Sequence, residues 1–541
     1  MSIQKKIAKN AVYNFLIKVI TLAFGFIASV VVARFLGPER YGVYSFVMWV
    51  LYAVGLLVNL GINTTITKYV SEFWGRSDFS TITSIFRKLF RFEVVAGVVA
   101  TLLLFFFAPL IARWYNNPNL SLYLKVSASV LLPMGLMWVY NGLFCGLQRY
   151  DLIAIINLII SPLTVGIILL VLYLGGKIEW LVAVSTITNI LLMISYIYFK
   201  RTKFDFLHGG GRRTCPERAD ARPSGRSRRT ADYGQKTAPD FSGKLFKFSA
   251  SVFVILILDA IVWERFGILF LSIFSTSSEI AFYNVAFILS SRTMILLPGA
   301  LTGILLPAMS EVYGGGNKEE LARVHSNATR YLAMLSLPLC LGGIAIARQL
   351  LPVLYGSSFQ PASLLFIILL LGGTVGSIST SSSSLLYSAE LQGVVVRVGI
   401  LSALVNLIVS WLLVHNFGAK GVAFANALAQ TTAGVIIIFY AYKKYMKQKF
   451  PYSNIVRIIS SSVLMGIIAL VMAETIKGAL GVICALIVSF PIYILSLLFT
   501  RSLTSEDINL LESVIHRMPE TWGRTIQPTL GRLIRFFYSH R

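Results

Sequence analysis

The chain has 541 residues, of which 56% are apolar and only 13% are charged, and its mean hydropathy is +0.74. Soluble globular proteins carry about 45–50% apolar and about 25% charged residues, so this composition argues against a soluble enzyme. The formal net charge of +25 is compatible with nucleic-acid binding or with a membrane protein whose cytoplasmic loops are basic, and the positions of the charges decide between the two.

Stretches of roughly 20 mostly apolar residues, the length that crosses a bilayer as a helix, recur along the whole chain. Fourteen such windows lie at about 11–33, 42–66, 92–112, 122–146, 152–174, 179–199, 247–273, 280–305, 328–349, 362–387, 394–415, 421–442, 455–474 and 479–500. The first window is too long for a signal peptide and no small-residue cleavage site follows it, so we expect it to be retained. The pattern predicts an all-α polytopic membrane protein with about 14 transmembrane helices.

The distribution of Lys and Arg predicts the orientation of these helices. If the N-terminus is cytoplasmic, 37 of the 48 Lys and Arg residues fall on the cytoplasmic side and eight on the opposite side. Basic residues concentrate in cytoplasmic loops of membrane proteins. We therefore expect a multi-pass protein of the plasma (cytoplasmic) membrane with both termini in the cytoplasm. The net charge is then explained by topology, and no nucleic-acid partner is expected.

An internal repeat relates the two halves of the chain. Residues Tyr44 to Gly75 align without a gap on Tyr283 to Gly314 at an offset of 239, so that KYVSEFWG corresponds to PAMSEVYG. Each half holds six windows, an even number, which gives both halves the same orientation. Parallel repeats of this kind are one transporter architecture, with the substrate site between the halves near the bilayer midplane. Two shorter pairs follow in the same order: INLIIS at 156–161 with VNLIVS at 405–410, and GGKIEWLVAV at 175–184 with GAKGVAFANA at 418–427.

The repeat suggests a division of the chain into five parts. These are an N-terminal six-helix bundle (1–200), a basic cytoplasmic loop (201–246), a C-terminal six-helix bundle (247–442), two additional transmembrane helices (443–500) and a cytoplasmic tail (501–541). The loop is rich in Gly, Pro and Arg and nearly free of aliphatic residues, so we expect it to be disordered. Its composition fits either a contact with anionic lipid headgroups or a locally shifted reading frame.

Three stretches resemble a known family. ARFLGPERYGVYSF at 33–46, LYGSSFQPA at 354–362 and FGAKGVAFANALAQ at 417–430 are similar to signature stretches of the polysaccharide-biosynthesis (O-antigen-type) flippases. These flippases belong to a superfamily that also holds multidrug extruders and lipid II flippases. The resemblance covers most of residues 5–500. It implies an extruder-like fold and a transporter that moves polyprenyl-(pyro)phosphate-linked oligosaccharide to the outer leaflet by alternating access. A lipid II-type flippase and a cation-coupled multidrug antiporter are the related alternatives.

Ionisable side chains inside the predicted spans indicate the substrate site, because such groups are costly in a bilayer unless they face a partner or a wet cavity. The seventh span contains Asp259, Glu264 and Arg265, the eighth contains Arg292, and the first contains Lys18. The three cations are candidates for lining a cavity and binding the phosphate or pyrophosphate of the lipid carrier. The alternatives are structural pairing of Arg265 with Glu264 or Asp259, and snorkelling of Lys18 to the membrane surface.

Two further roles are assigned to polar residues in the spans. Asp259 and Glu264 are candidates for binding H⁺ or Na⁺ to couple transport, and no other cofactor is expected. Asn14, Asn63 and Asn141 are candidates for sugar contacts, although a buried Asn more often joins helices by hydrogen bonds.

A membrane-bound glycosyltransferase is the main alternative outside the transporters. It would need acidic residues in a sizeable extracytoplasmic loop, whereas the predicted outer loops here are short and hold no carboxylate cluster. The sequence has neither a GxxxxGK phosphate-binding loop nor an HExxH zinc motif. We therefore expect no enzymatic activity, no catalytic residues and no metal site. The expected partners are the lipid-linked oligosaccharide, membrane lipids, and a polysaccharide polymerase or glycosyltransferases.

Overall fold

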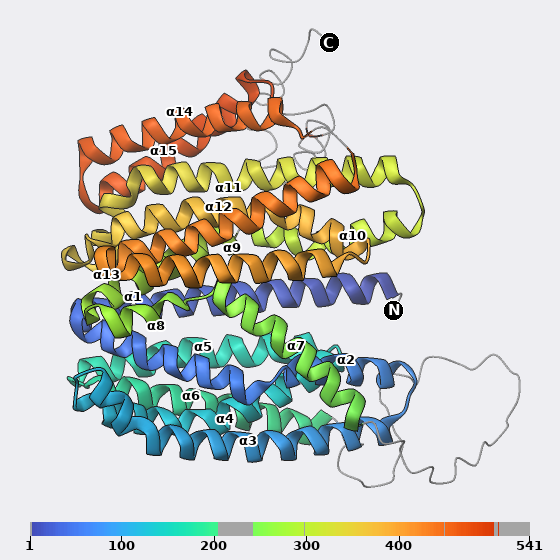
Figure 1. Cartoon of the computed structure of the whole chain (residues 1–541), viewed down its shortest axis with the longest axis vertical. Coiled ribbons are helices and arrows are strands. Elements are labelled where there is room, and N and C mark those ends of the chain that lie inside the picture. Colours follow the sequence, from blue (N-terminus) through green and yellow to red (C-terminus); the bar gives the residue numbers. More distant parts are fainter. Residues whose placement is uncertain (1–2, 204–241, 297, 448–449, 503–506, 508–541) are drawn as a thin grey trace, which may run out of the picture. The chain divides into compact units, whose positions relative to one another are not determined.

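The computed structural model describes residues 3–203, 242–296, 298–447, 450–502 and 507, and every regular element in this part of the chain is a helix (Figure 1). The chain divides into two compact units. One comprises Met1–Phe35 and Val43–Asp259, and the other comprises Leu36–Gly42 and Ala260–Arg541. Residues 36–42 are part of the first helix but belong to the second unit, and they include a break in that helix at Gly37.

The first unit is built around helix α4. Its helices are α1 (Ile3–Asn59), α2 (Ile62–Gly75), α3 (Phe79–Trp114), α4 (Asn119–Gly146), α5 (Tyr150–Tyr173), α6 (Ile178–Lys203) and most of α7 (Ser242–Trp263). Helix α4 packs against α2, α3 and α6, and α5 packs against α6. The buried core between these helices is aliphatic and aromatic and includes Ile66, Phe86, Leu143, Phe144 and Tyr196.

The second unit has the same plan, with helix α12 at its centre. Its helices are α8 (Gly267–Phe274), α9 (Ser277–Leu296), α10 (Pro298–Gly314), α11 (Lys318–Tyr355), α12 (Ala362–Ser388), α13 (Gln392–Phe439), α14 (Tyr452–Ile476) and α15 (Gly478–Phe499). Helix α12 packs against α9, α10, α11 and α13, while α14 and α15 pack together and against α11. The last two helices are the addition to the repeat that the sequence predicted.

Helix boundaries confirm the repeat. Helices α2 and α10 end at Gly75 and Gly314, the aligned ends of the repeated segment. Three residues later, Asp78 and Asn317 each accept a hydrogen bond from a main-chain N–H at the start of the next helix. Such N-terminal caps satisfy main-chain donors that lack helical partners. The two capping residues are also 239 positions apart. The internal repeat therefore includes the N-cap residues of α3 and α11 as well as the apolar pattern.

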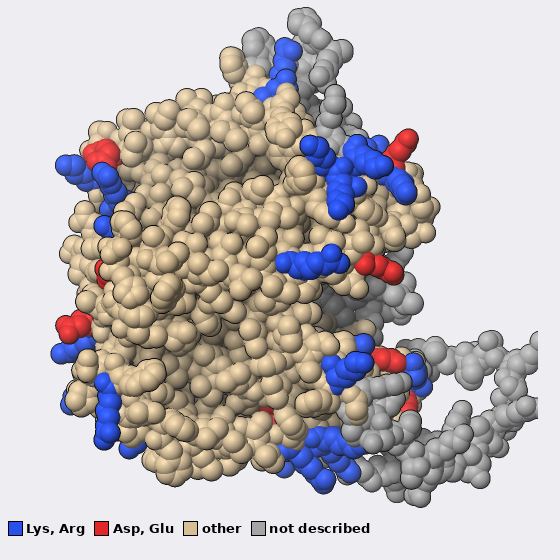
Figure 2. All heavy atoms as spheres, viewed as in Figure 1, with Lys and Arg blue, Asp and Glu red and all other residues tan. Residues whose placement is uncertain are grey.

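Helix length and polarity fit a membrane. Eleven helices of the described part are long and apolar enough to cross a bilayer. Two of them, α1 and α13, each contain one predicted span and most of the next, and the predicted span 280–305 is divided between α9 and α10. On the face of each unit seen in Figure 2, Lys and Arg lie near the ends of helices and the surface between them is almost entirely uncharged. This pattern is that of a multi-pass membrane protein.

The expected loops at 34–41 and 416–420 are replaced by single breaks within α1 and α13. Each break is at a glycine with positive φ, Gly37 (φ 70°) and Gly418 (φ 51°). At Gly418 the freed main-chain N–H of Ala419 donates to Glu279 Oε2 at 2.8 Å. The apolar windows therefore located the helices correctly, whereas the connections are tighter than the windows suggested, because one glycine is enough to turn the chain.

Substituting Gly418 by Ala should destabilise the second unit by about 2 kcal/mol or more, since a β-carbon there would add backbone strain and collide with the Glu279 carboxylate. Thermal unfolding of the detergent-purified protein measures this effect. Gly399→Ala on the same helix is the matched control, because no atom lies within 4 Å of its β-carbon position. Equal melting temperatures for the two variants would contradict the role of this break.

Helices α2 and α4 are joined by a regular series of hydrogen bonds within the first unit. Asn63 Nδ2 donates to the carbonyl of Trp138 at 2.9 Å. Two further donors follow at steps of four residues: Thr67 Oγ1 to Gly142 O at 3.3 Å and Ser71 Oγ to Gly146 O at 3.0 Å. A β-carbon at Gly142 would lie 2.7 Å from the Asn63 carbonyl oxygen, so the glycines permit the close approach. Small residues and interhelical hydrogen bonds are the usual means of packing helices in a bilayer.

Candidate functional site

The predicted seventh span is interrupted where its ionisable residues lie. Helix α7 ends at Trp263 and α8 begins at Gly267, so Glu264 and Arg265 occupy the break instead of the middle of one continuous helix. Gly267 permits this turn to pack closely, because a β-carbon there would collide with Val422 Cγ1 and lie 3.1 Å from the Tyr283 hydroxyl. Irregular backbone at membrane depth is tolerated where protein or a wet cavity surrounds it.

A hydrogen-bonded amide orients Arg265. Its Nη1 donates to Asn284 Oδ1 on α9 at 2.8 Å, and Asn284 Nδ2 in turn donates to the Tyr41 hydroxyl at 3.3 Å. Asn284 and Tyr41 are almost fully buried. Asn284 was not identified from the sequence. The only signal was its polar character within the apolar stretch AFYNVAF at 281–287.

Arg292 on α9 brings a second guanidinium to the same part of the second unit. The charges of Arg265 and Arg292 both act on Glu264, and those of Arg265 and Glu264 act on Arg292. Among the described residues no ion pair joins Glu264 to either guanidinium, and Arg292 makes no hydrogen bond there. The three side chains are half-buried. The cluster therefore holds two cations and one carboxylate, with the guanidinium of Arg292 available to a ligand.

The other candidates lie outside this cluster. Lys18 on α1 and Asp259 on α7 are exposed and belong to the first unit. Asn14 lies on α1, and its side chain is outside the described part of the chain. The structure thus brings Glu264, Arg265 and Arg292 together in one unit and places the remaining ionisable candidates in the other.

The remaining two Asn candidates join helices in the first unit. Besides its bond to Trp138, Asn63 Nδ2 lies 3.4 Å from Asn141 Oδ1, and Asn141 Nδ2 donates to the Tyr196 hydroxyl at 2.9 Å. These contacts connect α2, α4 and α6. The amides therefore make the contacts of the helix-joining alternative that the sequence left open.

A buried carboxylate outside the sequence candidates lies on α3. Glu93 is 1% exposed and lies against Gly135 of α4, where a β-carbon would come within 2.5 Å of its Oε1. Within the described residues neither of its oxygens has a hydrogen-bond partner. Glu93 lies at the edge of the predicted span that begins at residue 92, and it packs against a glycine more than 40 residues away.

Comparison with known proteins identifies the relatives of this chain. A family model described as "Polysaccharide biosynthesis protein" matches residues 7–313. The chain is 26% identical over 185 residues to the "Probable low-salt glycan biosynthesis flippase Agl15" of Haloferax volcanii, a match that spans 34% of this chain and 39% of that protein. The match thus covers well under two thirds of the relative.

Solved structures share the fold. The "Lipid II flippase MurJ, inward closed conformation" is similar with a TM-score of 0.68 at 16% identity, over 91% of this chain and 99% of that chain. An inward-facing "multidrug resistance MATE family transporter of the MOP superfamily" is similar with a TM-score of 0.57 at 12% identity, over 79% and 94% of the two chains. At these identities the similarity is one of fold, and it confirms the repeated helical architecture expected from the sequence.

Proposed function

This chain belongs to the family of polysaccharide biosynthesis proteins, and on that premise we propose that it is a membrane transporter for lipid-linked oligosaccharide. It flips a polyprenyl-(pyro)phosphate-linked oligosaccharide from the inner to the outer leaflet by alternating access, for polysaccharide or glycan assembly. It performs no chemical step on its cargo. It works in the plasma membrane with both termini in the cytoplasm, beside the polymerase or glycosyltransferases that use its cargo.

The observation that carries this proposal is a pair of guanidiniums, that of Arg265 at the α7–α8 break and that of Arg292 on α9. Arg265 is held by Asn284, while Arg292 has no hydrogen-bond partner among the described residues. A guanidinium presents a planar set of donors that matches phosphate oxygens in a bidentate manner. A cation within a membrane helix is costly when it has no hydrogen-bond or ion-pair partner, so the retention of Arg292 is best explained by an anionic ligand.

The charge balance of the cluster suits transient binding. A (pyro)phosphate must shed water to cross the membrane, and cations along its path replace part of the lost hydration. Glu264 offsets one of the two positive charges, which keeps the anion from being held too tightly to be released. The apolar lipid chain can remain in the bilayer throughout. Lys18, Asp259 and Asn14 are proposed as further groups along the path, and Glu264 and Asp259 as sites for a coupling H⁺ or Na⁺.

The test is the cellular pool of lipid-linked oligosaccharide, measured by mass spectrometry with and without this protein. We expect completed polyprenyl-linked glycan to accumulate on the cytoplasmic side when the protein is absent and to fall to its normal level when the gene is restored. The mass of the accumulated species identifies the cargo. An unchanged pool would contradict the proposal, and accumulation of lipid II instead would assign the chain to that related function.

A further inference from the structure

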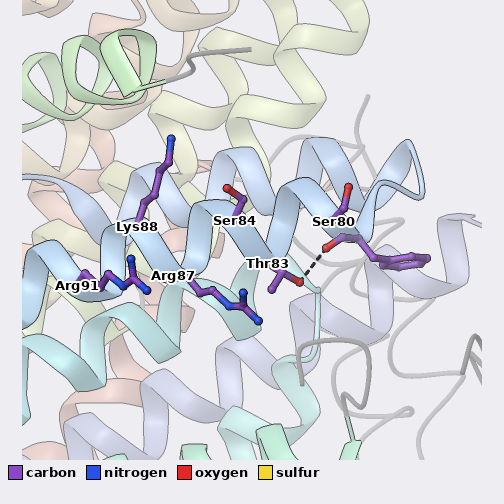
Figure 3. A pocket seen from close by; sticks show the side chains of 7 residues that line it. Ser80, Thr83, Ser84, Arg87, Lys88 and Arg91 are labelled. Carbon is purple, nitrogen blue, oxygen red and sulfur yellow. Dashed lines mark hydrogen bonds between the residues drawn. The ribbon is translucent and has the colours of Figure 1, made fainter. Parts of the chain in front are cut away.

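Hydroxyl and cationic side chains form a continuous stripe along the first turns of α3. With Phe79 they line a hollow of about 520 Å³, and Figure 3 shows them following one another along a single helix. The sequence has no acidic residue between Asp78 and Glu93, and Asp78 is occupied by hydrogen bonds from Ser80 and Thr81. The stripe, called here the α3 stripe, consists of Ser80, Thr83, Ser84, Arg87, Lys88 and Arg91.

The end of α6 brings two more cations close to α3. Lys200 Nζ lies 4.6 Å from the centre of the Phe86 ring on α3. The charges of Arg201 and Arg87 both act on Lys200. Among the described residues no ion pair joins Arg87, Lys200 or Arg201 to an acid, and the same holds for Arg91. Like charges gathered this closely repel one another, and an anion among them would relieve that repulsion.

The repeat supplies an internal comparison. Helix α11 begins 239 residues after α3, and its first turn contains Glu319 and Glu320. The residue of α11 equivalent to Arg91 is Arg330, which forms a buried ion pair with Asp507. Cations at the start of α11 are thus accompanied by acids of the same helix, whereas Arg87 and Arg91 of the α3 stripe have no ion pair among the described residues. The two repeated helices therefore differ in how their cations are balanced.

Beyond Arg91 the same face of α3 becomes apolar while staying exposed. Val95, Val99, Leu102 and Phe106 are 63%, 49%, 50% and 72% exposed. Steps of three and four residues keep these side chains on the face that carries Arg91. The helix thus presents cations and hydroxyls near its N-terminus and an exposed apolar strip further along the same face. This arrangement is complementary to a molecule with an anionic head and hydrocarbon chains.

We propose that the α3 stripe, together with Lys200 and Arg201, binds the phosphate of an anionic membrane phospholipid. The hydrocarbon chains of this lipid lie along the exposed strip from Val95 to Phe106. With the orientation proposed above, the bound lipid belongs to the inner leaflet, where anionic headgroups attract basic residues at about 1 kcal/mol each. This lipid site shares no residue with the Arg265–Arg292 cluster and does not require that the cargo be an oligosaccharide.

Native mass spectrometry of the full chain, delipidated and titrated with phosphatidylglycerol or phosphatidylcholine, tests the site. The variant Arg87→Gln/Lys88→Gln/Arg91→Gln should bind phosphatidylglycerol at least about tenfold more weakly, because three headgroup contacts are lost, while its weak binding of phosphatidylcholine stays unchanged. The matched control is Lys443→Gln/Lys444→Gln/Lys447→Gln, which removes three exposed cations from the second unit and should bind phosphatidylglycerol like the wild type.

Three results would overturn the proposal. The α3 variant could bind phosphatidylglycerol within twofold of the wild type, or the control variant could lose as much affinity as the α3 variant, which would indicate a net-charge effect. The third result is that polyprenyl phosphate displaces phosphatidylglycerol at a concentration much lower than that of phosphatidylglycerol itself. This result would assign the hollow to the carrier lipid. Equal melting temperatures confirm that the variants fold, and Arg292→Gln should retain phosphatidylglycerol binding, which separates failure of this site from failure of the transport proposal.

Discussion

Substituting Arg292 by Gln should reduce transport of the lipid-linked cargo by about 100-fold while leaving the protein folded. A hydrogen bond to a charged group contributes about 1.5–3 kcal/mol, and a 1.4 kcal/mol difference changes a rate about tenfold. No hydrogen-bond or ion-pair partner of Arg292 among the described residues is lost in the substitution, so the fold should tolerate it. The rate at which restored protein clears accumulated lipid-linked glycan is the measurement.

Two further variants make this result specific. Arg292→Lys keeps the charge without the planar donors and should retain part of the activity, because Lys binds phosphate as a point charge. Arg348→Gln removes an exposed arginine of α11 and should behave like the wild type. Clearance within twofold of the wild-type rate by Arg292→Gln would show that this guanidinium does not contact the cargo.

Substituting Asp507 by Ala should lower the free energy of unfolding by about 3–5 kcal/mol, the usual cost of breaking a buried ion pair by removing one partner. Arg330 Nη2 lies 2.9 Å from Asp507 Oδ1, and the side chains are 2% and 7% exposed. The Tyr331 hydroxyl donates to the same oxygen at 2.6 Å. The variant would leave a buried guanidinium without its counter-charge, and thermal or denaturant unfolding in detergent measures the loss.

An exposed ion pair of the same chain is the control for this second experiment. Arg76 and Glu72 are joined at 2.6 Å, but their side chains are 63% and 36% exposed. Exposed pairs contribute about 0–1 kcal/mol, so Glu72→Ala should have little effect on stability. A loss for Asp507→Ala no larger than that for Glu72→Ala would mean that Asp507 does not anchor α11.

The sequence predicted the helices well because a membrane helix is specified locally. Twenty apolar residues satisfy every main-chain group within one segment, and each of the fourteen windows falls mainly on described helices. Connections were predicted less well, since one left-handed glycine replaced each of the expected loops at 34–41 and 416–420. Whether an apolar helix continues or turns depends on the backbone angle of a single residue. The average composition of a window of about 20 residues does not reveal that angle.

For the candidate site, the sequence predicted which ionisable residues belong to it but not which residues they contact. Glu264, Arg265 and Arg292 were recognisable because ionisable residues are rare in apolar spans. The choice of Asn284 as the partner of Arg265 depends on how two helices face each other. The pairing of Arg330 with Asp507 joins residues 177 positions apart, and no local pattern encodes such a contact.

Substitutions in α2 and in α4 should affect the hydrogen bonds between these two helices differently. All three donors are side chains of α2, whereas all three acceptors are main-chain oxygens of α4. Every amino acid supplies the same carbonyl, so α4 can change its sequence without losing an acceptor, provided that the glycines at 142 and 146 stay small. Evolutionary substitutions on α2 should therefore be limited to side chains that can donate a hydrogen bond. Those at 142 and 146 of α4 should be limited to small residues.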